Sequence, residues 1–195
     1  MDRNKAIQSV NEIKELMERS SKFVSLSGLT GILVGLYSLV GSYLAVNIVG
    51  VRMEHVYTLI LLGTGVLIAS VATAFFVSLY KSKKSRQKLF NRLTYRIVWN
   101  FSIPLLAGGL LCIALLLRKD YDLVSTIMLL FYGLSLVNVS KYTFSNVAWL
   151  GYAFLVLGIL DSFIPGYEWL WWTLGFGVFH LIYGVLFYFL YEKDS

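Results

Sequence analysis

Three polar side chains within long apolar stretches are the residues of this chain that could do chemistry: His180, Asp161 and Asn100. An imidazole can carry a proton or bind a ligand near neutral pH, and a carboxylate can bind a proton or a cation. Ionisable groups are costly to bury at membrane depth, so they usually face the interior of a helical bundle and often mark a functional path. The sequence therefore makes these residues the candidate ligand or proton site.

His180 lies about midway along the last apolar stretch, on a helical face that also carries Thr173, Gly177 and Gly184. The two glycines would let a ligand approach the ring, which favours His180 as the central ligand or proton carrier. The sequence is also consistent with a structural role, in which a neutral imidazole hydrogen-bonds a Ser, Thr, Tyr or Asn on a neighbouring helix and fixes helix register. Both interpretations stay open at this point.

Asp161 is the only acidic residue inside an apolar stretch and lies about one turn from its outer end, where it could equally be hydrated or act as a cap. Asn100 shares a helical face with Pro104, Gly108 and Cys112, and Pro104 predicts a kink that frees a backbone carbonyl. At a rise of about 1.5 Å per residue, Asn100 lies roughly 10 Å inward and Asp161 roughly 8 Å outward of the midplane. They can line a path with His180, but not one compact site.

Positioning these side chains requires membrane helices. A bilayer core about 30 Å thick needs roughly 17–25 helical residues per crossing, and a backbone in lipid must satisfy its own hydrogen bonds. We therefore expect an all-α polytopic bundle forming a single transmembrane domain over residues 23–195. Its six spans are predicted at residues 23–49, 56–80, 97–117, 123–139, 147–164 and 169–191.

Small residues indicate how these helices pack. Gly28, Gly31 and Gly35 lie on one face of the first span, with Gly31 and Gly35 as a GxxxG pair, and Gly177 and Gly184 lie on one face of the last. Since lipid gives no hydrophobic drive between helices, small residues that allow backbone contact are how such bundles associate. The pattern predicts close helix packing, with a narrow solute path along the same face as the alternative.

Charge predicts the orientation. Of the 17 Lys and Arg residues, five precede the first span, seven fall in residues 81–96, and Lys141 and Lys193 follow on the same side, against three on the other. This positive-inside bias predicts that both termini are cytoplasmic. Residues 1–22 lack a signal peptide and place Ala6, Val10, Ile13 and Met17 at helical spacing, which predicts a cytoplasmic amphipathic helix.

The basic residues 81–96 contain no acidic residue. Basic side chains beside a bilayer attract anionic lipid headgroups at about 1 kcal/mol each. We expect the lipid bilayer, and anionic lipids at the cytoplasmic face, as partners, while a phosphorylated ligand and homo-oligomerisation stay open. Because topology explains the net charge of +6, no nucleic-acid partner is expected. The expected lipid contacts are Lys81, Lys83, Lys84, Arg86 and Lys88.

Four segments carry a resemblance to a known family: FVSLSGLTG at 23–31, IPLLAGG at 103–109, SKYT at 140–143 and GFGVFHLIYG at 175–184. They are similar to an uncharacterised family of small bacterial multipass membrane proteins. The resemblance implies a six-helix bacterial inner-membrane protein. It carries over no functional residues, because the family has no established activity.

The chain shows no HExxH, Cys pair, serine elbow, P-loop or paired intramembrane acids, so we expect neither an enzyme nor a cofactor or metal site. The leading hypothesis is a protein that binds or transports a small solute or ion through a polar interior built from spans 1, 3, 5 and 6. The alternative is a membrane-embedded sensor or scaffold that contacts a cytoplasmic protein or anionic lipid. Spans 1–3 and 4–6 would have inverted topologies, as in inverted-repeat transporters.

Overall fold

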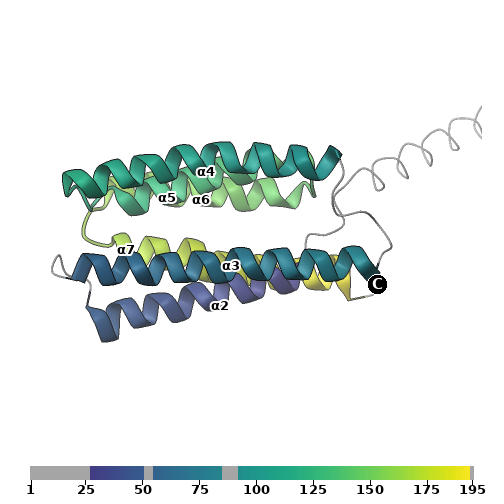
Figure 1. Ribbon diagram of the computed structural model, residues 1–195, viewed down its shortest axis with the longest axis horizontal. Helices are drawn as coiled ribbons and strands as arrows, with labels where there is room; N and C mark the ends of the chain where they lie inside the picture. The colour runs from purple at the N-terminus through teal and green to yellow at the C-terminus, as the bar shows by residue number, and fades with distance from the viewer. Residues whose placement is uncertain (1–26, 51–54, 85–91, 194–195) are drawn as a thin grey trace, which may run out of the picture.

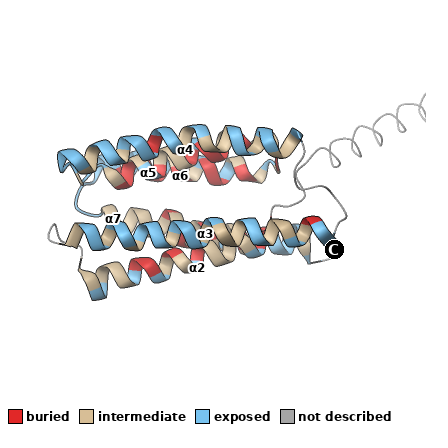
Figure 2. Cartoon of the chain, viewed as in Figure 1, coloured by how far each residue is buried: buried red, intermediate tan, exposed pale blue. Residues whose placement is uncertain are grey.

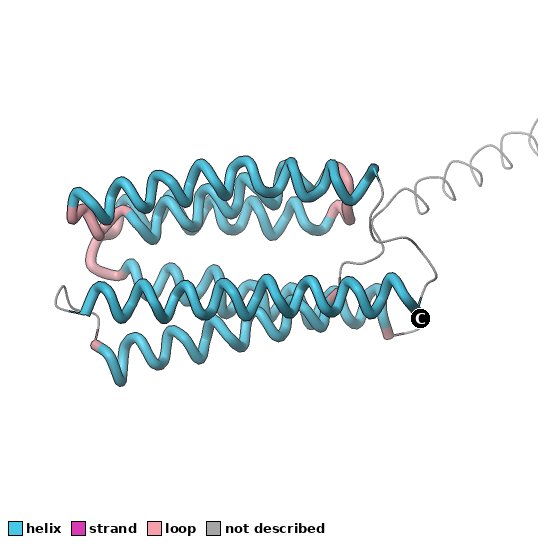
Figure 3. Tube along the Cα trace, viewed as in Figure 1, coloured by secondary structure: helices cyan, strands magenta, loops and turns pink. Residues whose placement is uncertain are grey.

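A computed structural model describes residues 27–50, 55–84 and 92–193, and every regular element in these ranges is helical (Figure 3). The amphipathic helix expected over residues 1–22, and the basic residues Arg86 and Lys88, lie outside the described residues. Nothing in the described part of the chain forms a strand. The all-α prediction is therefore confirmed for the described residues.

Six helices among the described residues are long and apolar enough to cross a membrane, which confirms the predicted number of spans. The chain is a membrane-embedded multipass protein. The first crossing is α2 (Gly28–Leu44), which the π-helical η1 (Ala45–Val49) extends. The next four are α3 (Val56–Lys84), α4 (Arg92–Arg118), α5 (Val124–Ser140) and α6 (Asn146–Phe163).

The last membrane helix covers Glu168–Glu192 and changes its winding along its length. It consists of α7 (Glu168–Trp172), the π-helical η3 (Thr173–Phe179), α8 (His180–Phe187) and the π-helical η4 (Tyr188–Glu192). Short π-helical segments within α-helices are uncommon and are frequent at functional sites. The η3 segment ends directly before His180, so the altered winding adjoins the histidine.

Helices α3 and α4 extend beyond the spans predicted from apolar residues alone. α3 continues to Lys84 and α4 begins at Arg92, several residues past the predicted limits of 80 and 97. Basic side chains at a membrane boundary keep their charged ends in water while their stems cover apolar surface. Helical structure can therefore continue past the apolar stretch, which hydropathy does not reveal.

The helices form two layers of three (Figure 1). In the α5 layer, α5 lies between α4 and α6; in the α2 layer, α2 lies between α3 and the last membrane helix. The structure therefore groups spans 3, 4 and 5 against spans 6, 1 and 2. This differs from a division into spans 1–3 and 4–6, because the first span packs on the last one.

A hydrophobic core lies between the layers. Its buried side chains all come from α5 and α6, and include Leu129, Leu136 and Phe154. Trp171, Tyr183 and other residues of the last membrane helix pack against it. The outer helices contribute little: no residue in the apolar window of α3 is buried and 6% are buried in α4, against 39% in α5 and in α6 (Figure 2). The buried residues of these spans therefore come mainly from α5 and α6 and hardly at all from α3 and α4.

Glycines set the distance between α2 and the last membrane helix. A Cβ atom built on Gly31 would lie 2.9 Å from the Gly184 Cα, and one on Gly35 would lie 2.8 Å from the Gly177 carbonyl oxygen. Both distances are too short for a real Cβ, so the two backbones touch only because these residues are glycines. The close contact positions His180, which lies between Gly177 and Gly184 in the sequence.

Candidate functional site

His180 is almost completely buried, and its ring links the two layers. Its Nε2 lies 2.7 Å from the hydroxyl oxygen of Tyr132 on α5, and its Nδ1 lies 3.3 Å from the carbonyl oxygen of Gly175. A carbonyl can only accept, so Nδ1 donates to Gly175 and Nε2 accepts from the Tyr132 hydroxyl; the tautomer is assigned from these partners. Both ring nitrogens of the neutral imidazole are therefore satisfied.

Aromatic rings surround this histidine. The ring centroids of Tyr132 and Phe154 each lie 5.3 Å from that of His180, and Phe176 stacks on it at 6.1 Å. Tyr132 and Phe154 belong to the α5 layer, whereas His180 and Phe176 belong to the last membrane helix. A polar pair enclosed by apolar rings has a strong hydrogen bond, because little water competes for it.

Asp161 lies against the start of α5, in an environment different from that of His180. Its Oδ2 accepts a hydrogen bond from the Thr126 hydroxyl at 2.9 Å, and only 3% of Asp161 is exposed. The neighbouring Ser125 also lies beside this carboxylate and donates its own hydroxyl to the Glu168 carbonyl oxygen at 3.0 Å. The start of α5, the end of α6 and the start of α7 therefore meet around one carboxylate.

Asn100 pairs with a second asparagine. The side-chain amide nitrogen of Asn138 on α5 donates to the Asn100 backbone oxygen at 2.8 Å. The side-chain oxygen of Asn100 lies 3.4 Å from the same nitrogen. The Asn100 amide donates to the Arg96 carbonyl at 2.7 Å within its own helix. This pair ties α4 to α5 close to the ends that carry the basic residues.

All three candidate residues thus have their polar partner on α5, at Thr126, Tyr132 and Asn138. Successive partners are six residues apart, which on an α-helix is about 9 Å along the axis and about 120° around it. The structure therefore places His180, Asp161 and Asn100 at three depths and on three sides of α5. They form three separate pairs and not one site.

The sequence did not identify α5 as the shared partner. The expected polar interior came from spans 1, 3, 5 and 6, although polar residues such as Tyr132 and Asn138 were visible in the short fourth span. Their spacing of six residues directs them to different neighbours, so no single polar stripe marks the helix. The density of hydroxyl and amide groups in this short helix was the available signal.

Three buried polar atoms have no hydrogen-bond partner among the described residues: Asp161 Oδ1, Trp171 Nε1 and the Tyr183 hydroxyl oxygen. Trp171 and Tyr183 both pack against the hydrophobic core between the layers. A buried polar group without a partner costs about 1–3 kcal/mol, and most native buried groups avoid this cost. These three atoms are therefore buried groups whose hydrogen-bonding capacity is unused in the described part of the chain.

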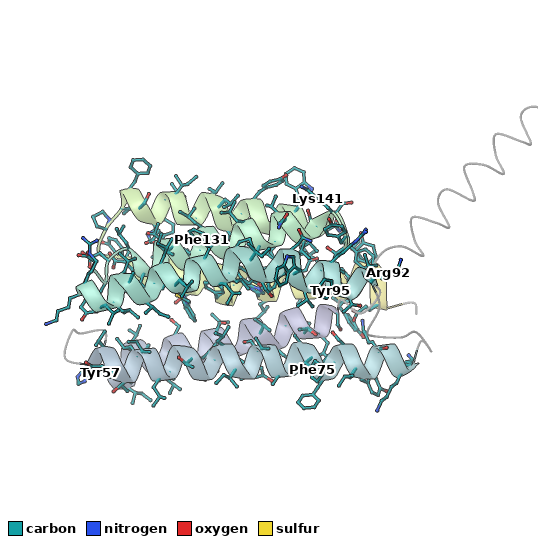
Figure 4. All side chains as sticks on the ribbon, turned by 45° about the horizontal axis from the view of Figure 1, so that its top comes forward. Tyr57, Phe75, Arg92, Tyr95, Phe131 and Lys141 are labelled. Carbon is teal, nitrogen blue, oxygen red and sulfur yellow. The ribbon has the colours of Figure 1, made fainter. Side chains whose placement is uncertain are left out.

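The remaining residues singled out from the sequence lie at helix contacts. α4 continues through Pro104 without interruption, and a Cβ on Gly108 would lie 2.5 Å from the Phe131 Cβ on α5. Figure 4 shows Phe131 between α5 and α4, whereas Phe75 on α3 points away from the bundle. Gly108 therefore brings α4 close to α5, on the same side as the Asn100 contact.

The end of the α2 layer that carries the basic residues is held by a carboxylate. Glu192 Oε1 lies 2.6 Å from Lys81 Nζ and accepts the Gly28 backbone N–H at 2.8 Å, and Ser27 donates to Oε2 at 3.4 Å. Lys81, expected to contact anionic lipid, thus has an acidic partner inside the protein. Lys83 and Lys84 are exposed at the end of α3.

Within the described ranges there is no group of three or more His, Cys, Asp or Glu side chains that could hold a metal ion. Comparison of the chain with protein-family models, with curated proteins and with solved structures found no match.

Proposed function

We propose that this protein binds or transports a small solute or ion through the interior between its two helical layers. The observation that carries the proposal is the set of buried, unpartnered polar atoms on Asp161, Trp171 and Tyr183. The Trp171 N–H can only donate, the ionised Asp161 oxygen can only accept, and the Tyr183 hydroxyl can do either. A polar guest would supply the missing partners, as lipid tails cannot.

The positions of these atoms favour a path over a single pocket. Trp171 and Tyr183 are twelve residues apart on the last membrane helix, which corresponds to about 18 Å along its axis. His180 lies between them and contacts the opposite layer through Tyr132. A solute moving along this helix would meet polar groups at several depths, and the Tyr132–His180 bond would be the contact to open.

We further propose that both termini are cytoplasmic and that the membrane is a bacterial inner membrane. The excess of Lys and Arg on one side supports this orientation, and the family resemblance supports the location. Reporter fusions at the C-terminus and in the loop after Phe163 test the orientation. A reporter active only in the cytoplasm should work at the C-terminus and fail in the loop; the reverse result would overturn the orientation.

The solute proposal is tested by a thermal-shift screen of the detergent-purified protein against ions and metabolites. A ligand at a hundredfold excess over its Kd stabilises the native state by about 2.7 kcal/mol, so a true ligand raises the Tm visibly. The Tyr183→Phe variant removes one unpartnered hydroxyl and leaves the ring in place. We expect it to fold as well as the wild type and to lose at least part of the ligand-induced shift.

His180→Ala is the complementary variant, because it removes the bond between the layers. Under the solute proposal it abolishes the ligand shift as well as lowering the basal Tm. If every ligand found in the screen raised the Tm of the wild type, Tyr183→Phe and His180→Ala equally, the proposed interior site would be contradicted. Stabilisation by anionic lipids alone would contradict it too.

The exposed Lys83 and Lys84 support a second candidate, a membrane-embedded sensor or scaffold that contacts anionic lipid or a cytoplasmic protein. This function predicts that charge reversal at both lysines abolishes binding to vesicles with anionic headgroups. It also predicts that His180→Ala lowers the Tm but keeps this binding. Vesicle co-flotation of both variants separates the two candidates. Retained binding after charge reversal would reject the sensor or scaffold.

A further inference from the structure

We infer that Asp161, Ser125 and Thr126 form a binding site for a monovalent cation at the end of α5 and α6. This inference rests on the proposed function, because it names an ion that the interior handles and where that ion binds. The site lies in the last turn of α6, close to the connection into α7. It is distinct from the Tyr132–His180 pair.

The carboxylate is the first argument. Asp161 is 3% exposed, and its Oδ1 has no partner within the described part of the chain, while Oδ2 is held by Thr126 at 2.9 Å. Removing a charged carboxylate from water without compensation costs far more than leaving a neutral group unpaired. Something positive must therefore accompany this group, either a bound proton or a cation.

The nearby backbone dipoles do not supply that charge. Thr126 lies in the first turn of α5, where the helix N-terminus contributes about half a positive charge, but Asp161 lies in the last turn of α6, where the C-terminus contributes about half a negative charge. The two contributions nearly cancel. In addition, no basic side chain forms an ion pair with Asp161 in the described structure.

The two hydroxyls favour a cation over a proton alone. Thr126 directs its hydrogen to Asp161 Oδ2 and Ser125 directs its hydrogen to the Glu168 carbonyl oxygen, so the lone pairs of both oxygens stay available. Beside the carboxylate, Ser125 is 8% exposed and Thr126 is 4% exposed. One anionic oxygen and two neutral oxygens match the charge of a monovalent, oxygen-binding cation such as Na⁺.

The experiment measures thermal unfolding of the full chain, purified without alkali metal ions, in NaCl, LiCl, KCl or choline chloride at equal ionic strength. We expect one of the alkali cations to raise the Tm saturably above the value in choline, by about 5 °C at a hundredfold excess over its Kd. Asp161→Asn should remove this cation-specific rise. Thr126→Val should raise the half-saturating concentration about tenfold, since one oxygen ligand is lost.

Asp120→Asn is the matched control, because Asp120 is exposed, lies at the same end of the bundle and pairs only loosely with Arg118 at 3.5 Å. This variant should keep the full cation-specific rise. If Asp161→Asn does not fold, Ser125→Ala takes its place and should weaken the response. A rise that persists unchanged in Asp161→Asn and in Ser125→Ala would overturn the site.

The wild type alone can also overturn the inference. Equal Tm values in all four salts would mean that Asp161 carries a proton and no cation. This failure is distinguishable from failure of the proposed function, because the solute-induced shift is measured at fixed salt and depends on Tyr183. Either shift can be lost while the other remains.

Discussion

The pair formed by α2 and the last membrane helix contrasts with α3, although both regions are apolar and rich in glycine. In this inner pair, formed by α2 and the last membrane helix, a Cβ on Gly184 would collide with backbone atoms of Gly28, Gly31 and Ile32. On α3, a Cβ on Gly63 or Gly65 would meet no described atom within 4 Å. The same residue type therefore fixes the helix spacing in one region and faces open space in the other.

This contrast shows what holds a membrane bundle together. Lipid tails are as apolar as leucine, so apolar character gives a helix no reason to be buried among other helices. Contact depends on whether the facing surfaces allow close backbone approach or supply a hydrogen bond. Between α2 and the last membrane helix the glycines meet backbone atoms, whereas α3 meets α2 through side chains, among them Val66 against Gly41 and a Thr73–Tyr37 hydrogen bond of 3.3 Å.

The largest expected effect comes from making one substitution in both regions. Gly184→Ala forces a methyl group into the backbone of α2 and should lower the free energy of unfolding by about 3 kcal/mol. Gly65→Ala on α3 should be neutral or stabilising by up to about 1 kcal/mol, because alanine favours the helix. Unfolding of both variants in mixed detergent micelles checks this, and equal losses would remove the distinction between the regions.

A second pair of variants sharpens the comparison within the interior. Tyr132→Phe removes the hydroxyl that satisfies His180 and should cost about 2 kcal/mol, since it leaves a buried ring nitrogen unpaired. Tyr183→Phe removes a hydroxyl that has no described partner and should leave stability unchanged or slightly higher. Tm values in ligand-free buffer test this; a larger loss in Tyr183→Phe would show that its hydroxyl has a structural partner.

The smallest effect concerns the point where α3 is tied to the inner pair. Glu192→Gln weakens the contacts to Lys81 and to the N-terminus of α2, and should cost about 1 kcal/mol at low salt. Added salt should destabilise the wild type more than the variant, because salt screens this charge interaction. Parallel salt dependences in the two proteins would mean that the carboxylate contributes through neutral hydrogen bonds alone.

Hydropathy was sufficient to predict the number of membrane helices, because each crossing imposes a length and a composition that neighbours do not alter. The side chains on neighbouring helices that hydrogen-bond the polar residues could not be predicted in the same way. Thr126 went unnoticed because a threonine in an apolar helix can bond its own backbone, and only the position of Asp161 on another helix shows otherwise. The pairing of Asn100 with Asn138 likewise depends on how α4 and α5 are arranged.

The contact between Glu192 and the start of α2 also has a consequence for how the chain assembles during synthesis. The Gly28 N–H and the Glu192 carboxylate are 164 residues apart in sequence, whereas α4, α5 and α6 follow one another directly. Since a nascent chain folds from its N-terminal side, the α5 layer can form as soon as its three helices emerge. The glycine face of α2 must therefore remain without its final neighbour until the last membrane helix has been synthesised.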